Sequence, residues 1–160
     1  FDGSGAGLYI PSTPQLAFGT GDYTIEFWLY YASTSGNYDL IDLRGTAGTG
    51  TAPVIYMTGG TFYVGISSTI VITTTPPSAN TWHHIALTRA SSSLKLFIDG
   101  GQAGSTYTDT SNLLSYPSYI GYYVLGGYPL NGYIDDLRIT KGYARYTANF
   151  ALPTSALPTY

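Results

Sequence analysis

The sequence predicts an all-β protein, an antiparallel β-sandwich, and three observations support this fold class. Short segments in which apolar and polar residues alternate recur along the chain, which is the pattern of strands with one buried face. Clusters of Gly, Pro and Ser separate these segments at short intervals, as in sandwiches and barrels. No window shows helical periodicity, and no internal repeat of about 20–50 residues is visible, which argues against a propeller or a solenoid.

The stretch 82–100, WHHIALTRASSSLKLFIDG, shows the strand pattern most clearly. Ile85 and Leu87 fall on one side of a first strand, and Leu94 and Leu96 fall on one side of a second strand. The polar sequence Ala-Ser-Ser-Ser joins the two, and Asp-Gly-Gly after the second strand favours a tight reversal. We therefore expect a β-hairpin here.

Ten strands are expected along the chain, which at 160 residues fits one domain. They cover residues 8–10, 23–31, 39–43, 54–58, 61–66, 70–74, 82–89, 94–99, 118–123 and 132–140. Residues 1–150 are predicted to form the sandwich. Residues 151–160, ALPTSALPTY, are predicted to be an extended tail or linker, because Pro disfavours strand pairing.

Composition excludes several classes of function. A net charge of −3 and only six Lys and Arg argue against nucleic-acid binding, which needs a basic patch. The absence of Cys excludes disulfides and a Cys-based zinc site. No apolar run approaches the ~18–20 residues that span a bilayer. An uncharged surface rich in Tyr and Thr favours an extracellular location, and a first residue other than Met suggests a segment of a longer or processed protein.

The hairpin and four further stretches resemble motifs of the concanavalin A-like lectin/glucanase superfamily, in its laminin-G-like branch. In chain order these stretches are FDGSGAGLYIP, GDYTIEFWLYY, LIDLRG and NGYIDDLRITKGYARYTANFALPT. The resemblance covers nearly the whole chain and implies a jelly-roll sandwich. It implies no single function, because this fold hosts lectins, glycosidases, adhesion modules and spacers. The closing stretch, with RYTANF and a following Pro, is similar to versions common in phage tail and other phage structural proteins.

The sequence predicts no enzyme. Retaining glycosidases need two carboxylates about 5–5.5 Å apart, and the glucanases of the family carry them in a Glu-x-Asp-x-x-Glu strand. This chain has a single Glu, Glu26, which we expect to be a hydrogen-bonded or rim residue. Asp135 and Asp136 are adjacent and so point to opposite faces of a strand. The same reasoning prevents His83 and His84 from holding one metal ion, and we expect one of them inside the sandwich and the other near the surface.

The resemblance also implies a structural Ca²⁺ site. In the family, the first Asp of an Asp-x-x-Arg strand commonly holds the ion together with backbone carbonyls near an N-terminal Phe-x-Gly. Mapped onto this sequence, the ligands are Asp135 and the backbone near Phe1, Asp2 and Gly3. The alternative is that the carboxylate of Asp135 or Asp136 pairs with Arg138 or Arg44. Asp136 with Arg138, and Asp42 with Arg44, are also spaced to form ion pairs on one strand face.

Tyrosine is the second unusual feature of the composition. The chain has seventeen Tyr, and six of them lie among glycines between residues 116 and 133. Tyr rings beside polar loops suit stacking on sugars, they suit a protein–protein interface, and they also occur in an ordinary sandwich. If a sugar is bound, we expect the loop 122–128 to hold it through Tyr122, Tyr123 and Tyr128.

These observations predict a non-catalytic recognition or structural module of an extracellular assembly. The phage resemblance implies a virion protein, a tail fibre or decoration protein, that contacts host glycan or neighbouring subunits within an oligomer or a multi-domain protein. The alternative is a carbohydrate-binding lectin domain appended to a secreted bacterial enzyme or adhesin.

Overall fold

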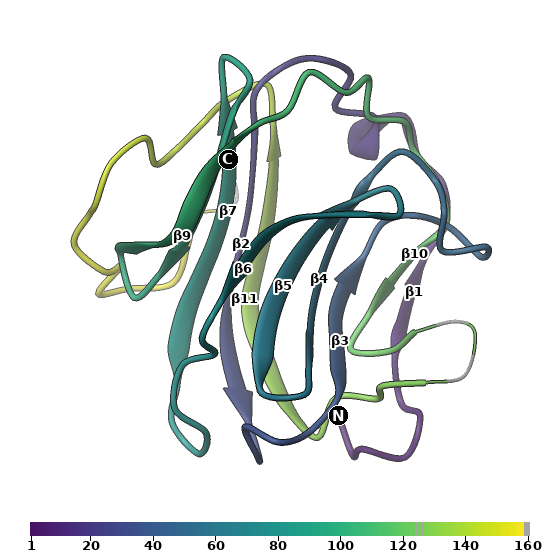
Figure 1. Cartoon of the computed structure of the whole chain (residues 1–160), viewed down its shortest axis with the longest axis vertical. Coiled ribbons are helices and arrows are strands. Elements are labelled where there is room, and N and C mark those ends of the chain that lie inside the picture. The colour runs from purple at the N-terminus through teal and green to yellow at the C-terminus, as the bar shows by residue number, and fades with distance from the viewer. Residues whose placement is uncertain (124, 126, 159–160) are drawn as a thin grey trace.

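Two antiparallel β-sheets pack face to face around one apolar core (Figure 1), which confirms the predicted sandwich. The computed structural model describes residues 1–123, 125 and 127–158. A short 3-10 helix, η1, spans Pro14–Leu16. In the part of the chain that is described, no helix is long and apolar enough to cross a membrane.

The first sheet has six strands, and the second has five. In spatial order the first contains β1 (Leu8–Ile10), β10 (Ser118–Ile120), β3 (Tyr38–Asp42), β4 (Pro53–Thr58), β5 (Thr61–Ile66) and β6 (Thr69–Thr74). The second contains β11 (Gly132–Lys141), β2 (Tyr23–Tyr31), β7 (His83–Ala90), β8 (Ser93–Ile98) and β9 (Gly101–Thr108). The two sheets lie one behind the other in Figure 1.

Alternation along the strands builds the core, as β2 illustrates. Ile25, Phe27 and Leu29 are fully buried and belong to the cluster between the sheets. Their neighbours Thr24 and Glu26 point to the outer face of the same strand, and yet they are also fully buried. A second layer must therefore cover the outer face of the five-stranded sheet.

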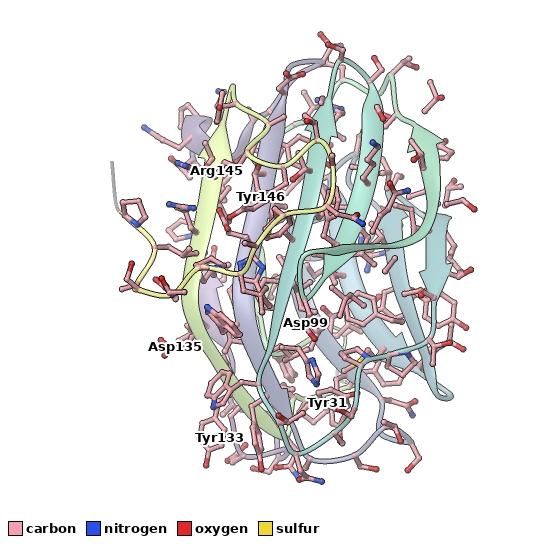
Figure 2. The ribbon with its side chains drawn as sticks, turned by 90° about the vertical axis from the view of Figure 1, so that its left-hand side faces the viewer. Tyr31, Asp99, Tyr133, Asp135, Arg145 and Tyr146 are labelled. Atoms are coloured by element: carbon pink, nitrogen blue, oxygen red, sulfur yellow. The ribbon has the colours of Figure 1, made fainter. Side chains whose placement is uncertain are left out.

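That layer is the segment that follows β11, residues 142–158, here called the C-terminal segment. Figure 2 shows it crossing over β2 and β7 on the outer face of the sheet. The backbone N–H of Phe150 donates to the carbonyl of Gly100 at 3.0 Å, and the Lys95 ammonium donates to the carbonyl of Thr147 at 2.8 Å. Leu157 is buried, with 7% of its surface exposed. Residues 151–158 form no strand and pack on the domain through Leu157.

Most strands lie within one residue of their predicted bounds, with two exceptions. β10 ends at Ile120 rather than at residue 123. β9 was not predicted, because its sequence GQAGSTYT offers no buried apolar series and most of its residues are exposed.

Candidate functional site

A cleft on the outer face of the six-stranded sheet gathers two of the three tyrosines that were predicted to bind a ligand. Its volume is about 300 Å³. We call it the tyrosine cleft, and its lining residues are Asp39, Arg44, Tyr56, Thr58, Tyr123 and Tyr128. Strands β3 and β4 form its floor, and the loops after β3 and β10 supply its walls.

Asp39 reaches the cleft because of a β-bulge in β3. The register between β3 and β4 shifts between Asp39 and Ile41. In a regular strand Asp39 and Asp42, three residues apart, would point to opposite faces, and the extra residue brings both to the outer face. Sequence analysis did not single out Asp39. The available signal was that two successive apolar residues, Leu and Ile, separate Asp39 from Asp42, which is a spacing that a bulge allows.

The carboxylate of Asp39 is an unusual group for a cleft floor. The residue is 3% exposed, and its Oδ1 atom has no hydrogen-bond partner among the described residues. Burial, together with the negative charge of Asp42, raises the pKa of Asp39 well above its ordinary value, and Arg44 opposes this shift. Because a buried polar atom normally has a partner, this oxygen is an unsatisfied acceptor in a residue that lines the cleft.

Arg44 is held in place by Asp42, which confirms the predicted ion pair. Its Nε donates to Oδ1 of Asp42 at 2.9 Å, and Nη2 donates to Oδ2 at 2.7 Å. Nη1 donates to the carbonyl of Ser67 at 3.2 Å. Hydrogen bonds therefore hold the guanidinium on two sides, and a ligand in the cleft would contact a positive charge whose position is fixed.

Aromatic rings form the rest of the cleft. Tyr56 stacks on Tyr63 of the adjacent strand, with ring centroids 4.9 Å apart and planes inclined by 14°. Tyr128 accepts the backbone N–H of Asp39 through its carbonyl at 2.8 Å, and it has a left-handed φ of 63°. A Cβ on Gly48 would lie 2.7 Å from the hydroxyl oxygen of Tyr123. A residue with a side chain at position 48 would therefore displace this ring.

Tyr122 lies elsewhere. It packs on the N-terminal segment, where a Cβ on Gly7 would lie 2.5 Å from the Cβ of Tyr122, and it does not line the tyrosine cleft. Residues 124 and 126 of the predicted loop lie outside the described residues. The loop 122–128 therefore contributes Tyr123 and Tyr128 to the cleft, and a role for Tyr122 in binding stays a prediction.

Glu26 is hydrogen-bonded, as expected. Its carboxylate is buried beneath the C-terminal segment, where Oε1 accepts from Nε of Arg138 at 2.8 Å and Oε2 accepts from the hydroxyl of Tyr146 at 2.7 Å. The Nε2 atom of His84 lies 3.4 Å from Oε2. Burial alone would raise the pKa of Glu26, but the contacts with His84, Tyr146 and Arg138 outweigh it and lower this pKa.

The two histidines point to opposite sides of β7, as alternation predicts. His84 is fully buried on the outer face, beneath the C-terminal segment, whereas Nδ1 of His83 lies 2.6 Å from Oδ2 of Asp99. The expectation that one histidine lies near the surface is wrong, since His83 is only 9% exposed. Its contact with the Asp-Gly-Gly turn shields it from solvent.

The predicted pair of Asp136 with Arg138 is also wrong. A register shift between Asp135 and Arg138 interrupts the pairing of β11 with β2. Arg138 is the register partner of Glu26 and forms its ion pair there, with Nη2 2.7 Å from Oε1. Asp136, with a φ of 52°, turns toward the C-terminal segment and accepts the backbone N–H of Leu157.

Of the predicted calcium ligands, Asp135 is set apart along the chain from the backbone near Phe1, Asp2 and Gly3. The N-terminal residues pair with the chain around the start of β11: the carbonyl of Phe1 accepts the N–H of Gly132, and the N–H of Gly3 donates to the carbonyl of Leu130. Asp135 lies three residues further along β11, about 10 Å at strand spacing, whereas Ca²⁺ ligands lie about 2.3–2.6 Å from the ion. No group of three or more His, Asp or Glu that could hold a metal occurs in the described residues. Calcium binding stays a prediction, tested by melting with and without a chelator: an unchanged melting temperature would rule it out.

Comparison with known proteins agrees with this architecture. The family model of the concanavalin A-like lectin/glucanases superfamily named for laminin G matches residues 2–145. A search of curated proteins found no match.

Three solved structures are similar in fold. Domains LG4-5 of the mouse laminin α1 chain are 17% identical, with a TM-score of 0.64, over 97% of this chain and 46% of that one. Trypanosoma rangeli sialidase is 17% identical, with a TM-score of 0.63, over 88% and 24%. The binding domain of botulinum neurotoxin serotype D is 12% identical, with a TM-score of 0.64, over 89% and 38%. The chain thus spans less than half of each of these three proteins. Together with the match along most of the sequence, the two-sheet architecture shows that the chain belongs to the concanavalin A-like lectin/glucanases superfamily, as a laminin-G-like jelly-roll domain.

Proposed function

We propose that this domain is a non-catalytic binding module that holds a saccharide in the tyrosine cleft. The observation that carries the proposal is the buried Oδ1 atom of Asp39, which lacks a partner among the described residues and belongs to a group that lines the cleft. A sugar hydroxyl supplies the missing hydrogen bond, and the neighbouring rings supply apolar contact for the face of a sugar ring.

The chemistry of the cleft suits a neutral polyol. Because its pKa is raised well above the ordinary value, the carboxyl of Asp39 keeps its proton to a higher pH than a free carboxyl does, and a protonated carboxyl both donates and accepts. The hydroxyls of Thr58, Tyr123 and Tyr128 add further groups that donate and accept. A volume of about 300 Å³ is at the lower end of the range for ligand pockets and fits one sugar unit.

The carboxylates of this face support binding rather than hydrolysis. Asp42, the second acidic residue on the outer face of β3, has both oxygens bonded to the guanidinium of Arg44. A glycosidase of the retaining type needs a free nucleophilic carboxylate opposite a protonated acid. Glu26 does not supply it, because it is buried on the other sheet and bonded to Arg138 and Tyr146.

A glycan array followed by calorimetric titration tests the proposal. We expect discrete saccharide hits that Tyr128→Ala and Tyr123→Ala weaken at least tenfold. Tyr107→Ala is the matched control, because Tyr107 is an exposed tyrosine on β9 of the other sheet, and it should bind like the parent chain. An array without hits, or equal loss in the control, would refute the assignment to this cleft. Turnover of a glucan by the isolated chain would refute the non-catalytic role.

The larger protein that carries the domain is a separate part of the proposal. The similarity of the closing stretch to phage structural proteins supports a virion appendage in which the module contacts host glycan or neighbouring subunits. The alternative is a lectin domain of a secreted bacterial enzyme or adhesin. Light scattering separates them in part: oligomers or filaments support assembly, whereas a monomer with saccharide hits supports the appended lectin.

A further inference from the structure

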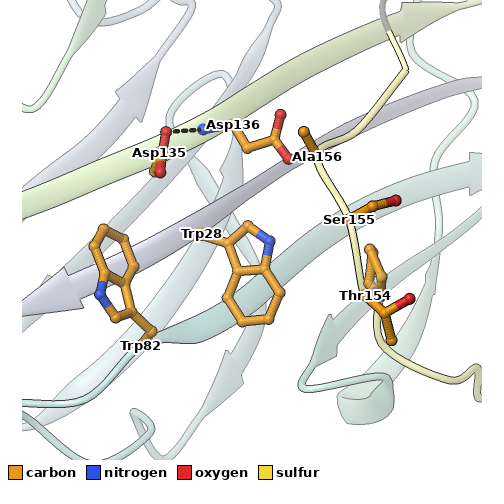
Figure 3. Close-up of a pocket in the computed structure, with 8 residues that line it drawn as sticks. Trp28, Trp82, Asp135, Asp136, Thr154, Ser155 and Ala156 are labelled. Atoms are coloured by element: carbon orange, nitrogen blue, oxygen red, sulfur yellow. Dashed lines mark hydrogen bonds between the residues drawn. The ribbon is translucent and has the colours of Figure 1, made fainter.

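A second pocket lies on the outer face of the five-stranded sheet, so that the core separates it from the tyrosine cleft. Figure 3 shows this pocket, here called the tryptophan pocket, which has a volume of about 500 Å³. Its lining residues are Trp28, Trp82, Asp135, Asp136, Pro153, Thr154, Ser155 and Ala156. We propose that the tryptophan pocket binds a neutral oligosaccharide, which gives the domain one saccharide site on each sheet.

Paired strands hold the aromatic part of the pocket. Trp28 and Tyr30 alternate on the outer face of β2, and their register partners on β11 are Asp135 and Tyr133. Trp82 precedes β7 and reaches the same face, with its ring centroid 5.8 Å from that of Tyr30. Trp28 projects from β2, which is paired on both sides, and Trp82 directly precedes β7, so paired strands hold both rings in position.

These rings remain open to a ligand. Trp82 is 44% exposed and Tyr133 is 61% exposed. Tyr133 lies 5.7 Å from Tyr30 and 6.3 Å from Trp82 between ring centroids, so the pocket continues into a wider aromatic surface. Exposed aromatic residues of this size are seldom gathered in one place without a partner. A sugar ring, with its apolar face of C–H groups, stacks on such a surface.

Polar groups line the opposite side. Asp135 is exposed, and its Oδ1 accepts the backbone N–H of Asp136 at 2.8 Å. Oδ2 of Asp136 accepts the N–H of Leu157 at 2.6 Å, which fixes the C-terminal segment as the wall of the pocket. Thr154 and Ser155 bring hydroxyls to that wall (Figure 3). Carboxylates accept bonds from sugar hydroxyls, and hydroxyl side chains accept or donate them.

Charge selects the class of sugar. The lining contains two Asp and neither Lys nor Arg, and the guanidinium of Arg138 on the same strand is bonded to Glu26. Two carboxylates repel sialic and uronic acids, so the ligand is uncharged. A quaternary ammonium group also binds beside aromatic rings, but it would fill a small part of a volume of about 500 Å³. The volume and the hydroxyl-bearing wall fit an oligosaccharide.

Tryptophan emission isolates this site. The chain has two Trp, and both line the tryptophan pocket. We would titrate the full chain with cello-, laminari-, manno- and chito-oligosaccharides, with sialyllactose as the acidic probe and tetramethylammonium chloride as the cationic probe. We expect a saturable change in emission with at least one neutral oligosaccharide and none with the charged probes.

Variants separate the tryptophan pocket from the tyrosine cleft. Trp82→Ala, which keeps Trp28 as the reporter, should weaken the neutral sugar at least tenfold, and Asp135→Asn should weaken it about threefold or more. Tyr123→Ala should leave the emission titration unchanged even if it abolishes binding in the tyrosine cleft. Circular dichroism checks that each variant is folded. Silence with every neutral oligosaccharide, a response confined to sialyllactose or tetramethylammonium, or loss of the response in Tyr123→Ala would each overturn the proposal.

Discussion

The hydroxyl of Tyr146 donates a hydrogen bond of 2.7 Å to Oε2 of Glu26, which lies 120 residues earlier in the chain. The bond joins the C-terminal segment to the outer face of the central strand β2. Glu26 is fully buried there and also receives the guanidinium of Arg138. A buried carboxylate needs such donors, because it has lost its hydration. The C-terminal segment is therefore held by a polar anchor as well as by apolar packing.

Tyr146→Phe tests this anchor. We expect a loss of about 1.5–3 kcal/mol in the free energy of unfolding at pH 7, the range for a hydrogen bond to a charged group. The pKa of Glu26 is lowered in the folded state from its model-compound value of 4.5. Its contribution to stability is therefore complete above that value and is lost as the pH falls through the folded pKa. The difference between the parent and Tyr146→Phe should shrink at pH 3.

Urea unfolding at pH 7 and pH 3 provides the measurement for this variant. Tyr143→Phe is the control, because Tyr143 is 61% exposed and lies in the same segment. Its free energy of unfolding should change by less than about 0.5 kcal/mol. A loss of equal size at both pH values would show that the bond does not depend on the charge of Glu26, and no loss at either pH would show that Tyr146 acts by packing alone.

Asp39→Asn should stabilise the protein at neutral pH. Because the folded pKa of Asp39 lies well above the unfolded one, the folded state binds the proton more tightly. Stability is then greatest below the unfolded pKa and falls as the pH rises toward the folded pKa. Asn keeps the shape of the neutral carboxyl and removes this penalty. We therefore expect Asp39→Asn to have a higher free energy of unfolding than the parent chain at pH 8.

Melting temperatures between pH 3 and pH 8 measure this effect. The gain of Asp39→Asn over the parent chain should grow with pH. Asp135→Asn, which removes an exposed carboxylate, should leave the curve of the parent chain almost unchanged. A gain that is the same at every pH would contradict the raised pKa of Asp39.

The sequence predicted the strands in which apolar residues alternate with polar ones, and it missed the strand that lacks this alternation. β2 and β5 have their predicted bounds because apolar residues recur at every second position. β9, an edge strand with five successive exposed residues from Gly104 to Thr108, has no such series. The packing of the tail could not be predicted either, because Leu157 is a single apolar residue among Pro, Thr and Ser. Its buried position depends on the hydrogen bond that its backbone N–H donates to Asp136.

The residues of the tyrosine cleft were singled out in part for a similar reason. Composition marks Tyr123 and Tyr128, and both line the cleft, while their binding of a sugar stays a prediction. Asp39 and the pairing of Arg138 with Glu26 depend on bulges in β3 and β11, and a bulge changes which residues share a face without changing the composition. Trp28 and Trp82 are 54 positions apart by residue number, so only the pairing of β2 with β7 brings them to one pocket.

Arg89 and Asp109 form a fully buried ion pair of 2.8 Å that no sequence pattern indicated. The guanidinium also donates to the carbonyls of Gly19 and Gly21 and lies over the ring of Tyr23. Arg89→Met leaves the buried carboxylate of Asp109 without its ion partner, and the backbone N–H of Ser111 is the donor that it keeps. We expect a loss of about 3–5 kcal/mol in the free energy of unfolding, as for other broken buried pairs.

Urea unfolding of single and double variants checks this pair. Arg89→Met combined with Asp109→Leu removes both charges. It should recover part of the loss but not all of it, because the bonds from the guanidinium to the carbonyls of Gly19 and Gly21 are still missing. A double variant less stable than Arg89→Met would contradict the view that the stranded carboxylate causes most of the loss.

Gly100 connects the β8–β9 turn to the C-terminal segment, and Gly100→Ala should release that segment. The φ of Gly100 is +76°, and a Cβ there would lie 2.1 Å from the carbonyl oxygen of Phe150. Gly59→Ala is the matched control, since Gly59 has a φ of +57° and no atom within 4 Å of the added Cβ. The control isolates the cost of the left-handed backbone, about 1–2 kcal/mol, and Gly100→Ala should lose at least about 1 kcal/mol more.

Limited proteolysis read by mass spectrometry should cut Gly100→Ala within residues 142–158 and leave Gly59→Ala intact there. Equal losses and equal cleavage would show that the contact with Phe150 does not hold the segment.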